Sequence, residues 1–437
     1  MKKLFSIIMS VAMLLSFSAC AVPNMADTSS DNESSTTNVE IEQNDEEETV
    51  TTEETLTICI DYAMKSEMES ITEYYSKSSG STINIEFLVL SNDDDEKELQ
   101  ISQIQTEIMS GFGPDLFVLY SNNPKSESQI SLFSNMDKSI YSNIFYDMNS
   151  LIESDSDFDL SDYNQTVISA GQTDEGFYAF PLFYSFPTFF IGDECEIPSE
   201  DVNLYTIENI SDDYLRSSFS SMTRYYFSSI IPQIIDYDSE EILISQEEFT
   251  ALIEKVQDLK QYNMDYRETT EEELMNHDLD YLASGYSIQN AFSWCGEADV
   301  LVPLYNTDGS ITASVITYSA INRNTEFCDE CFEIIKILLD ENIQAGLGIT
   351  YDEKYYSANY YISSESIPVN NNAVVTMMSY GLINSENLTT QLLDCIDEIE
   401  YASFLNDIDR LIFDSLVWQD EVDTEYLYKQ INTLIHE

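Results

Sequence analysis

The chain offers few residues that could form a catalytic centre. It has two histidines, and His436 is the penultimate residue, so a Ser-His or Cys-His nucleophile pair would depend on His277. His277 lies in the acidic stretch 271–280, which is typical of an exposed helix. The sequence contains no GxSxG, HExxH or phosphate-loop motif. We therefore expect no catalytic residues, although two of the 81 carboxylates could still form a glycosidase pair.

Cys328 and Cys331 form the one CxxC motif of the chain. A redox-active pair needs surroundings that lower a thiol pKa, and the two acids between these cysteines have the opposite effect. A structural zinc ion needs four ligands, and no second pair lies nearby in the sequence. We predict that Cys331 packs on the apolar face of a helix. A disulfide among the other cysteines is not predictable from the sequence.

The acidic run 155–162, DSDFDLSD, begins like a calcium-binding loop. Such a loop needs glycine at its sixth position and glutamate at its twelfth, where this chain has Leu160 and Thr166. A helix capped by Asp159 or Ser161 is the better interpretation. We predict neither a specific metal site nor a cofactor, and weak cation binding by such acidic clusters stays open as an alternative.

The first twenty residues have the pattern of an export signal. Two lysines precede an apolar run that is too short to span a bilayer, and small residues follow it. Residues 17–20, FSAC, resemble the lipobox of bacterial lipoproteins, in which the cysteine is acylated after cleavage. We predict a signal peptide at residues 1–19 and lipidation of Cys20, with plain secretion as the alternative. Residues 20–54 would form an acidic, disordered tether, because they are rich in acids and contain no aromatic residue.

The charge balance excludes one class of partner. The chain has 81 Asp and Glu against 17 Lys and Arg, which gives a formal net charge of −64. Nucleic acids are bound through Lys and Arg that neutralise phosphates, so we expect no nucleic-acid partner. The hydrophobic fraction of 43% is nevertheless that of a globular protein, and the length is enough for two or three domains.

The body opens with alternating strand and helix patterns. Short β-favouring runs at 56–60, 83–90 and 116–119 are separated by two segments with helical spacing, which end at Gly80 and Gly111. This β-α-β-α-β order predicts parallel strands with right-handed crossovers, as in a doubly wound sheet. Ligands bind beyond the carboxyl ends of such strands, which places the loops 61–65, 91–95 and 120–123 at a candidate site.

Later segments extend the pattern. Residues 174–191 and 309–319 read as extended, the second leading to a helix that Asn324 would cap. From Ser385 to the end the spacing is helical, with a last helix after Asp423.

Several passages along the chain form a recognisable series. They are QTEIMSGFGPDLFV at 105–118, YAFPLFYS at 178–185, the DGS turn at 308–310, YSAIN at 318–322 and IKILLDENIQ at 335–344. In sequence and in order they resemble passages of the extracellular solute-binding lipoproteins of ABC importers, family 1, the maltose-binding-protein-like class. Together with the lipobox, the resemblance covers nearly the whole chain.

The resemblance implies a two-lobed periplasmic-binding-protein-like α/β fold, in which two doubly wound lobes are joined by hinge segments. Lobe 1 would comprise residues 55–180 and 320–369, and lobe 2 residues 184–317 and 370–437. The lobes would close on a ligand.

The ligand site is predicted partly from the resemblance and partly from the strand ends. Trp294 lies where the family often stacks a tryptophan on its ligand, with a core tryptophan as the alternative interpretation, and Tyr184 and Ser185 would lie on the first hinge strand. Asn122 and Tyr62 follow strands of lobe 1, where ligand is expected independently. Further candidates are Lys65 and Asn92 in the same loops. Asp115, Tyr225 and Tyr226 are candidates too, but Asp115 could instead brace its turn, and the two tyrosines could pack in the core of lobe 2.

Taken together, the sequence predicts a non-enzymatic substrate-binding lipoprotein on the outer face of the cell membrane. It would bind a small solute, with a carbohydrate favoured, and deliver it to the ABC permease subunits. The alternatives are a binder of polyamines or other cationic solutes, an extracellular carbohydrate-active enzyme and a tethered adhesion module.

Overall fold

The computed structural model of the protein describes residues 54–122, 130–192, 198–263, 298–357, 367–377, 379 and 386–436. These residues belong to one compact unit, Glu53–Glu437. The predicted signal peptide, Cys20, the tether up to residue 53 and His277 lie outside the described residues. No helix in the described segments combines the length and the apolar character that crossing a membrane requires.

The body begins with the predicted alternation of strands and helices. β1 (Thr55–Asp61), α2 (Lys65–Ser79), β2 (Asn84–Leu90), α3 (Asp94–Met109) and β3 (Leu116–Tyr120) follow one another, with the 3-10 turn η1 (Tyr62–Met64) before α2. β1 pairs in parallel with both β2 and β3, which confirms the predicted β-α-β-α-β unit. Gly80 ends α2 with φ at 68°, a left-handed conformation that glycine adopts at little steric cost.

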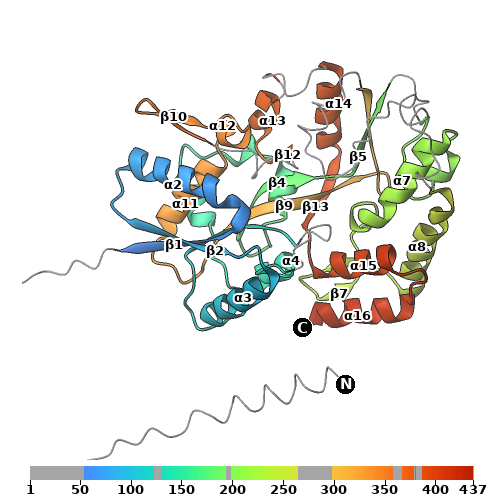
Figure 1. Cartoon of the computed structure of the whole chain (residues 1–437), viewed down its shortest axis with the longest axis horizontal. Helices are drawn as coiled ribbons and strands as arrows, with labels where there is room; N and C mark the ends of the chain where they lie inside the picture. The colour runs from blue at the N-terminus through green and yellow to red at the C-terminus, as the bar shows by residue number, and fades with distance from the viewer. Residues whose placement is uncertain are drawn as a thin grey trace, which may run out of the picture. The chain divides into compact units, whose positions relative to one another are not determined.

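The long strand β9 (Ile311–Ile321) organises the main sheet (Figure 1). In the described part of the chain this sheet has seven strands, in the order β12, β4, β9, β3, β1, β2, with β13 also paired to β9. β4 (Phe180–Ser185) lies antiparallel on one side of β9, and β12 (Ile367–Pro368) pairs with β4. On the other side, β3 pairs with residues 317–321 and β13 (Ile399–Phe404) with residues 311–315. β3 and β13 therefore lie end to end along β9, and their carboxyl ends meet at Ile316.

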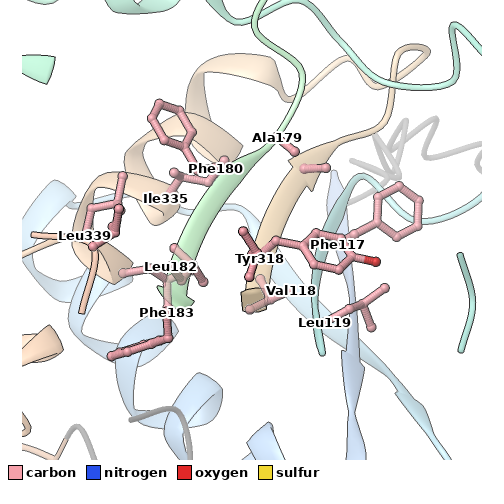
Figure 2. Packing of buried hydrophobic residues seen from close by; sticks show 14 of the residues in the cluster. Phe117, Val118, Leu119, Ala179, Phe180, Leu182, Phe183, Tyr318, Ile335 and Leu339 are labelled. Atoms are coloured by element: carbon pink, nitrogen blue, oxygen red, sulfur yellow. The ribbon is translucent and has the colours of Figure 1, made fainter. Parts of the chain in front are cut away.

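The larger hydrophobic core is built on this sheet. Figure 2 shows Phe180 and Leu182 of β4 beside Ile335 of α11 (Cys328–Leu338). The Phe180 ring is 6.3 Å from that of Phe332 on the same helix. Tyr318 of β9 is fully buried in this core.

The larger core draws residues from both predicted lobes. Leu301, Ile311 and Phe404 belong to it together with the β1 and β3 side chains. The Tyr318 ring lies 5.4 Å from that of Phe404, so β9 and β13 are packed as well as hydrogen-bonded. The lobe boundaries given above stay a prediction.

The smaller hydrophobic core is mainly helical. It is formed by the apolar faces of α7 (Asp213–Tyr225), α8 (Gln246–Leu259), α15 (Asp407–Trp418) and α16 (Thr424–His436). Phe189 on β5 and Ile235 on β6 add to it. A capping box between Ser245 and Glu248 starts α8, because each residue satisfies a backbone N–H of the other.

Most of the remaining elements are short. β5 (Thr188–Gly192) pairs with β8 (Ala298–Pro303), β6 (Ile235–Asp236) with β7 (Glu241–Ile242), and β10 (Ile349–Tyr351) with β11 (Lys354–Tyr356), all antiparallel. The other α-helices are α4 (Met136–Tyr141), α5 (Asn149–Ser154), α6 (Gln165–Ser169), α12 (Glu341–Gln344), α13 (Asn371–Met377) and α14 (Glu386–Asp397). The other 3-10 turns are η2 (Leu160–Asp162), η3 (Ile207–Asn209), η4 (Phe227–Ser229) and η5 (Lys260–Tyr262).

Two predicted details are wrong. The chain after Ser385 is not helical throughout, because β13 interrupts it and pairs with β9, a long-range contact that helical spacing cannot reveal. Asn324 does not cap the following helix, since α11 begins at Cys328 with Phe327 at its N-cap. The Asn324 N–H instead donates to Asn322 Oδ1 at 3.1 Å, within a turn.

Three structural interpretations are confirmed. Asp159 caps the turn η2 by accepting a hydrogen bond from the Ser161 N–H. Cys331 is fully buried on α11. Asp115 braces its turn, because its carboxylate accepts from the Thr57 N–H at 2.8 Å and from the Thr325 hydroxyl at 2.5 Å.

Candidate ligand-binding site

The carboxyl ends of β1, β2 and β3 lie side by side at one edge of the sheet. Three predicted site residues occupy the loops at this edge. Tyr62 is 57% exposed on the turn η1, immediately after β1. Lys65 is exposed at the start of α2 and lies 3.9 Å from Glu69, and Asn92 is exposed between β2 and α3. An aromatic face and polar groups are thus available to a ligand at this edge.

Asp61, the last residue of β1, fixes the geometry of this edge. Its Oδ1 accepts from Lys97 Nζ at 2.9 Å, and its Oδ2 accepts from the Tyr120 N–H at 2.9 Å. The Asp61 and Lys97 side chains are only 13% and 9% exposed. One carboxylate therefore ties the end of β1 to the end of β3 and to the helix that follows β2.

Asn122 lies where β3 and β13 meet. The Ser121 N–H donates to the Ile316 carbonyl of β9 at 2.8 Å, and the Asn122 N–H donates to the Leu405 carbonyl at 3.0 Å. The Asn122 side chain donates to the Ser134 carbonyl at 3.3 Å and is buried. Asn122 thus shares the sheet edge with Tyr62, Lys65 and Asn92 while also contacting the end of β13.

Tyr184 and Ser185 lie on the opposite side of β9, at the end of β4, where they pair with Val315 and Ser314. Tyr184 is 1% exposed, and burial raises the pKa of its hydroxyl well above its usual range. Ser185 is half-buried. Its partner Ser314 places its hydroxyl 3.0 Å from that of Ser229, so this strand end reaches the smaller core's turn η4.

Trp294 falls outside the described residues, so its interpretation as a ligand-stacking residue stays a prediction. The same holds for lipidation of Cys20. Of the two further tyrosines, Tyr225 is 38% exposed with its ring 5.7 Å from that of Phe413, and Tyr226 is partly buried against the smaller core.

A network of polar side chains lies beside Asn122 where β13 ends, and sequence reasoning missed it. We call Asn135, Asp137, Tyr237, Asn406 and Asp409 the junction network. The Asn406 amide donates to Asp137 Oδ2 at 3.3 Å and to the Tyr237 hydroxyl at 3.0 Å. Its backbone N–H donates to Asp409 Oδ2 at 2.9 Å. Asn135 Nδ2 donates to the same tyrosine hydroxyl at 3.4 Å.

The junction network connects the two cores. On one side, Asp137 lies on α4, whose neighbouring Met136 belongs to the larger core. On the other, Asp409 lies on α15, whose Ile408 and Ile412 belong to the smaller core. Part of this arrangement could be predicted from the sequence, because the Asn406–Asp409 spacing is that of a capping box.

Burial dominates the electrostatics of the junction network. It raises the pKa of Asp137 to about 7 and that of Asp409 to about 6, and the negative charge of a neighbouring aspartate adds to the effect in both cases. Hydrogen bonds to the carboxylates act in the opposite direction and are the weaker influence. The pKa of Tyr237 is raised as well, first by burial and then by the charge of Asp137.

Within the described residues, no group of three or more His, Cys, Asp or Glu side chains could hold a metal ion. Cys328 and Cys331 are free thiols, and burial raises the pKa of both, which does not favour a reactive thiolate. Asp155, in the motif that begins like a calcium loop, forms an ion pair with Lys336 at 2.5 Å.

Comparison with known proteins identifies the fold. No family model and no curated protein sequence matches the chain. An extracellular solute-binding protein family 1 structure from Alicyclobacillus acidocaldarius superposes with a TM-score of 0.54 at 12% identity, over 88% of this chain and 98% of that one. The ABC substrate-binding protein Lmo0181 from Listeria monocytogenes, in complex with cycloalternan, gives 0.53 at 15% identity over 88% and 98%. Maltose-bound MalE3 from T. maritima gives 0.51 at 13% identity over 87% and 99%.

The chain therefore has the mixed α/β fold of the two-lobed solute-binding proteins, and the predicted fold class is confirmed. The match extends over nearly the whole length of each of these structures. At these identities the likeness concerns the fold alone.

Proposed function

We propose that the protein is the substrate-binding component of an ABC importer, which captures a small solute between two lobes and delivers it to a permease. The observation that carries this proposal is the meeting of β3 and β13 on β9. β3 and β13 belong to different predicted lobes and direct their carboxyl ends to one point, where a ligand could contact both lobes. A ligand that binds both lobes favours their closure.

We further propose that the ligand is a carbohydrate. Sugars present C–H faces that stack on aromatic rings and hydroxyls that need polar partners. Tyr62 exposes such a ring at the sheet edge, with Asn92 and Lys65 in neighbouring loops. Two of the similar structures hold cycloalternan and maltose. Ser185 and Trp294 would complete the site from β4 and from lobe 2.

The proposal also includes two lobes, a lipid anchor and a binding role without catalysis. Lobe 1 would comprise residues 55–180 and 320–369, and lobe 2 residues 184–317 and 370–437, with β4 and β9 as hinge strands. Cys20 would carry the lipid that holds the body outside the membrane.

Cys20→Ser should release the protein from the membrane fraction into the medium, and retention of this variant in the membrane would contradict lipid anchoring.

Thermal-shift screening of the purified protein against oligosaccharides, monosaccharides and polyamines tests the function. A sugar that raises the melting temperature without being converted supports the proposal, because a ligand that binds only the folded state stabilises it. Product formation would instead indicate a carbohydrate-active enzyme, and stabilisation by polyamines alone a cationic-solute binder. No shift with any solute would contradict solute capture.

Trp294→Ala should weaken sugar binding by about 30-fold or more, because loss of a stacked aromatic anchor costs about 2 kcal/mol or more. The melting temperature of the ligand-free protein should change little. Isothermal titration calorimetry with the sugar found by screening measures the affinity. A collapse of the ligand-free protein would show that Trp294 is a core residue.

Trp418 provides a matched control, since it is the only other tryptophan in the chain and is 75% exposed at the end of α15. Trp418→Ala should leave sugar affinity unchanged. In Trp418→Phe, Trp294 is the sole tryptophan, so its fluorescence should respond to the sugar. An unresponsive signal would contradict stacking.

A further inference from the structure

The contact between the two cores contains acidic groups without a compensating cation. The ion pairs that the structure shows among its described residues do not include Asp137, Asp407 or Asp409. These three carboxylates are instead held by the amides of Asn135 and Asn406, by backbone N–H groups and by a hydroxyl. Asp137 is 9% exposed.

Each element packed around these acids presents neutral or acidic groups to them. The β6–β7 hairpin contributes the Tyr237 hydroxyl, and η4 contributes Ser228, whose hydroxyl donates to Asp409 Oδ1. Tyr401 of β13 and Tyr141 of α4 interact electrostatically with Asp137. Two cations follow these acids directly in the sequence. Lys138 donates to the Leu434 carbonyl on α16 at 3.3 Å, and the carboxylates that act electrostatically on Arg410 are Asp414 and Asp94.

We propose that Asp137 and Asp409 make the contact between the two cores sensitive to protons. When protonated, the two carboxyls are neutral and the junction network holds α4 and α15 together. When both protons are lost to solvent, two like charges share one poorly solvated site, and the junction loosens. This proposal concerns regulation of the solute site described above and rests on that proposed function, because α4 and α15 belong to different predicted lobes and solute capture requires the lobes to move relative to each other.

The sign of the pH dependence follows from the raised pKa values. An aspartate in the unfolded chain has a pKa of about 3.9. Between pH 4 and 7 the folded state therefore holds more protons at Asp137 than the unfolded state, so stability falls as the pH rises. The unfolding equilibrium constant should increase by up to about tenfold per pH unit from this group, and the change should end above pH 7. Asp409 adds a similar dependence that ends near pH 6.

Chemical denaturation of the wild type and of Asp137→Asn and Asp409→Asn at pH 5, 6, 7 and 8 tests the proposal. The difference in free energy of unfolding between the wild type and Asp137→Asn, which favours the wild type at pH 5, should decrease from pH 5 to 7 and then stay constant. Glu421→Gln is the matched control, because Glu421 is exposed and belongs to the segment after α15. It should follow the wild type at every pH. Parallel pH profiles for the wild type and both aspartate variants would overturn the proposal.

Hydrogen exchange of the wild type gives a second test that needs no variant. The Phe404 and Asn406 N–H groups donate directly to Asp137 and Asp409. After correction for intrinsic exchange, their protection should fall at least threefold between pH 6 and 8, while amides in β1 keep theirs. Unchanged protection would overturn the proposal.

The sugar found by screening separates this proposal from the proposed function. Its affinity for the wild type should weaken at least threefold from pH 6 to 8, and less for Asp137→Asn. Equal pH dependence in both proteins would overturn the regulatory role. If no solute binds at any pH, the proposed function fails, and the exchange measurement still decides whether the junction responds to protons.

Discussion

Replacing Lys97 with methionine should lower the free energy of unfolding by about 3–5 kcal/mol. Lys97 and Asp61 form a 2.9 Å ion pair, and both side chains are nearly buried. Methionine fills a similar volume but leaves the Asp61 carboxylate without its cation in a poorly solvated place. The double variant Lys97→Met/Asp61→Asn should recover part of this loss, because the uncompensated charge is gone. Chemical denaturation at pH 7 measures both effects.

The exposed pair of Lys65 and Glu69 is the control. It lies in the same part of the molecule, with side chains 52% and 55% exposed. Lys65→Met makes the same change in net charge and should cost at most about 0.5 kcal/mol. If Lys97→Met costs no more than Lys65→Met, Asp61 and Lys97 do not fix the sheet edge as described.

Gly171→Ala should lower the free energy of unfolding by about 3 kcal/mol or more, the upper end of what overpacking costs. A Cβ atom on Gly171 would lie 1.7 Å from the carbonyl oxygen of Ala179. That oxygen belongs to the backbone leading into β4, so it cannot rotate away as a side chain would. The Tyr178 and Ala179 N–H groups also donate to the Gly171 carbonyl, which fixes the two segments together. Thermal and chemical unfolding measure the loss.

Gly80→Ala is the control that separates a steric clash from the strain of placing alanine in a left-handed backbone conformation. Gly80 has φ at 68°, and nothing lies within 4 Å of a Cβ added there. Alanine at this position should cost about 1 kcal/mol, which is the strain of the left-handed conformation alone. Equal losses in the two variants would contradict a steric cause at Gly171.

Local patterns in the sequence account for much of the fold. The first three strands are marked by short apolar runs and the first two helices by apolar spacing followed by a glycine, and the structure has the strands in the predicted parallel arrangement. β13 was missed because Ile399 and Phe404 fit a helical spacing equally well. Its identity as a strand depends on pairing with β9, which no local pattern contains.

The candidate site was less predictable. Tyr62 and Asn122 could be named because strand ends mark ligand sites in α/β sheets. The junction network could not, because its members come from the start of α4, the β6–β7 hairpin and the start of α15. Each residue reads alone as a helix cap or a surface group, and only the folded chain brings Asp137 to Asn406.

The end-to-end placement of β3 and β13 also bears on how the molecule assembles. Residues 311–315 of β9 find their partner strand only near the end of the chain, in residues 399–404. Such pairing closes a long loop and forms late, so during synthesis this side of β9 is an open strand edge until residues 399–404 are present. An open edge can join the strand of another chain, and like charges on neighbouring molecules oppose such encounters. Because acidic residues outnumber basic ones 81 to 17 over the whole sequence, we expect charge repulsion to oppose such encounters during assembly as well as in the folded protein.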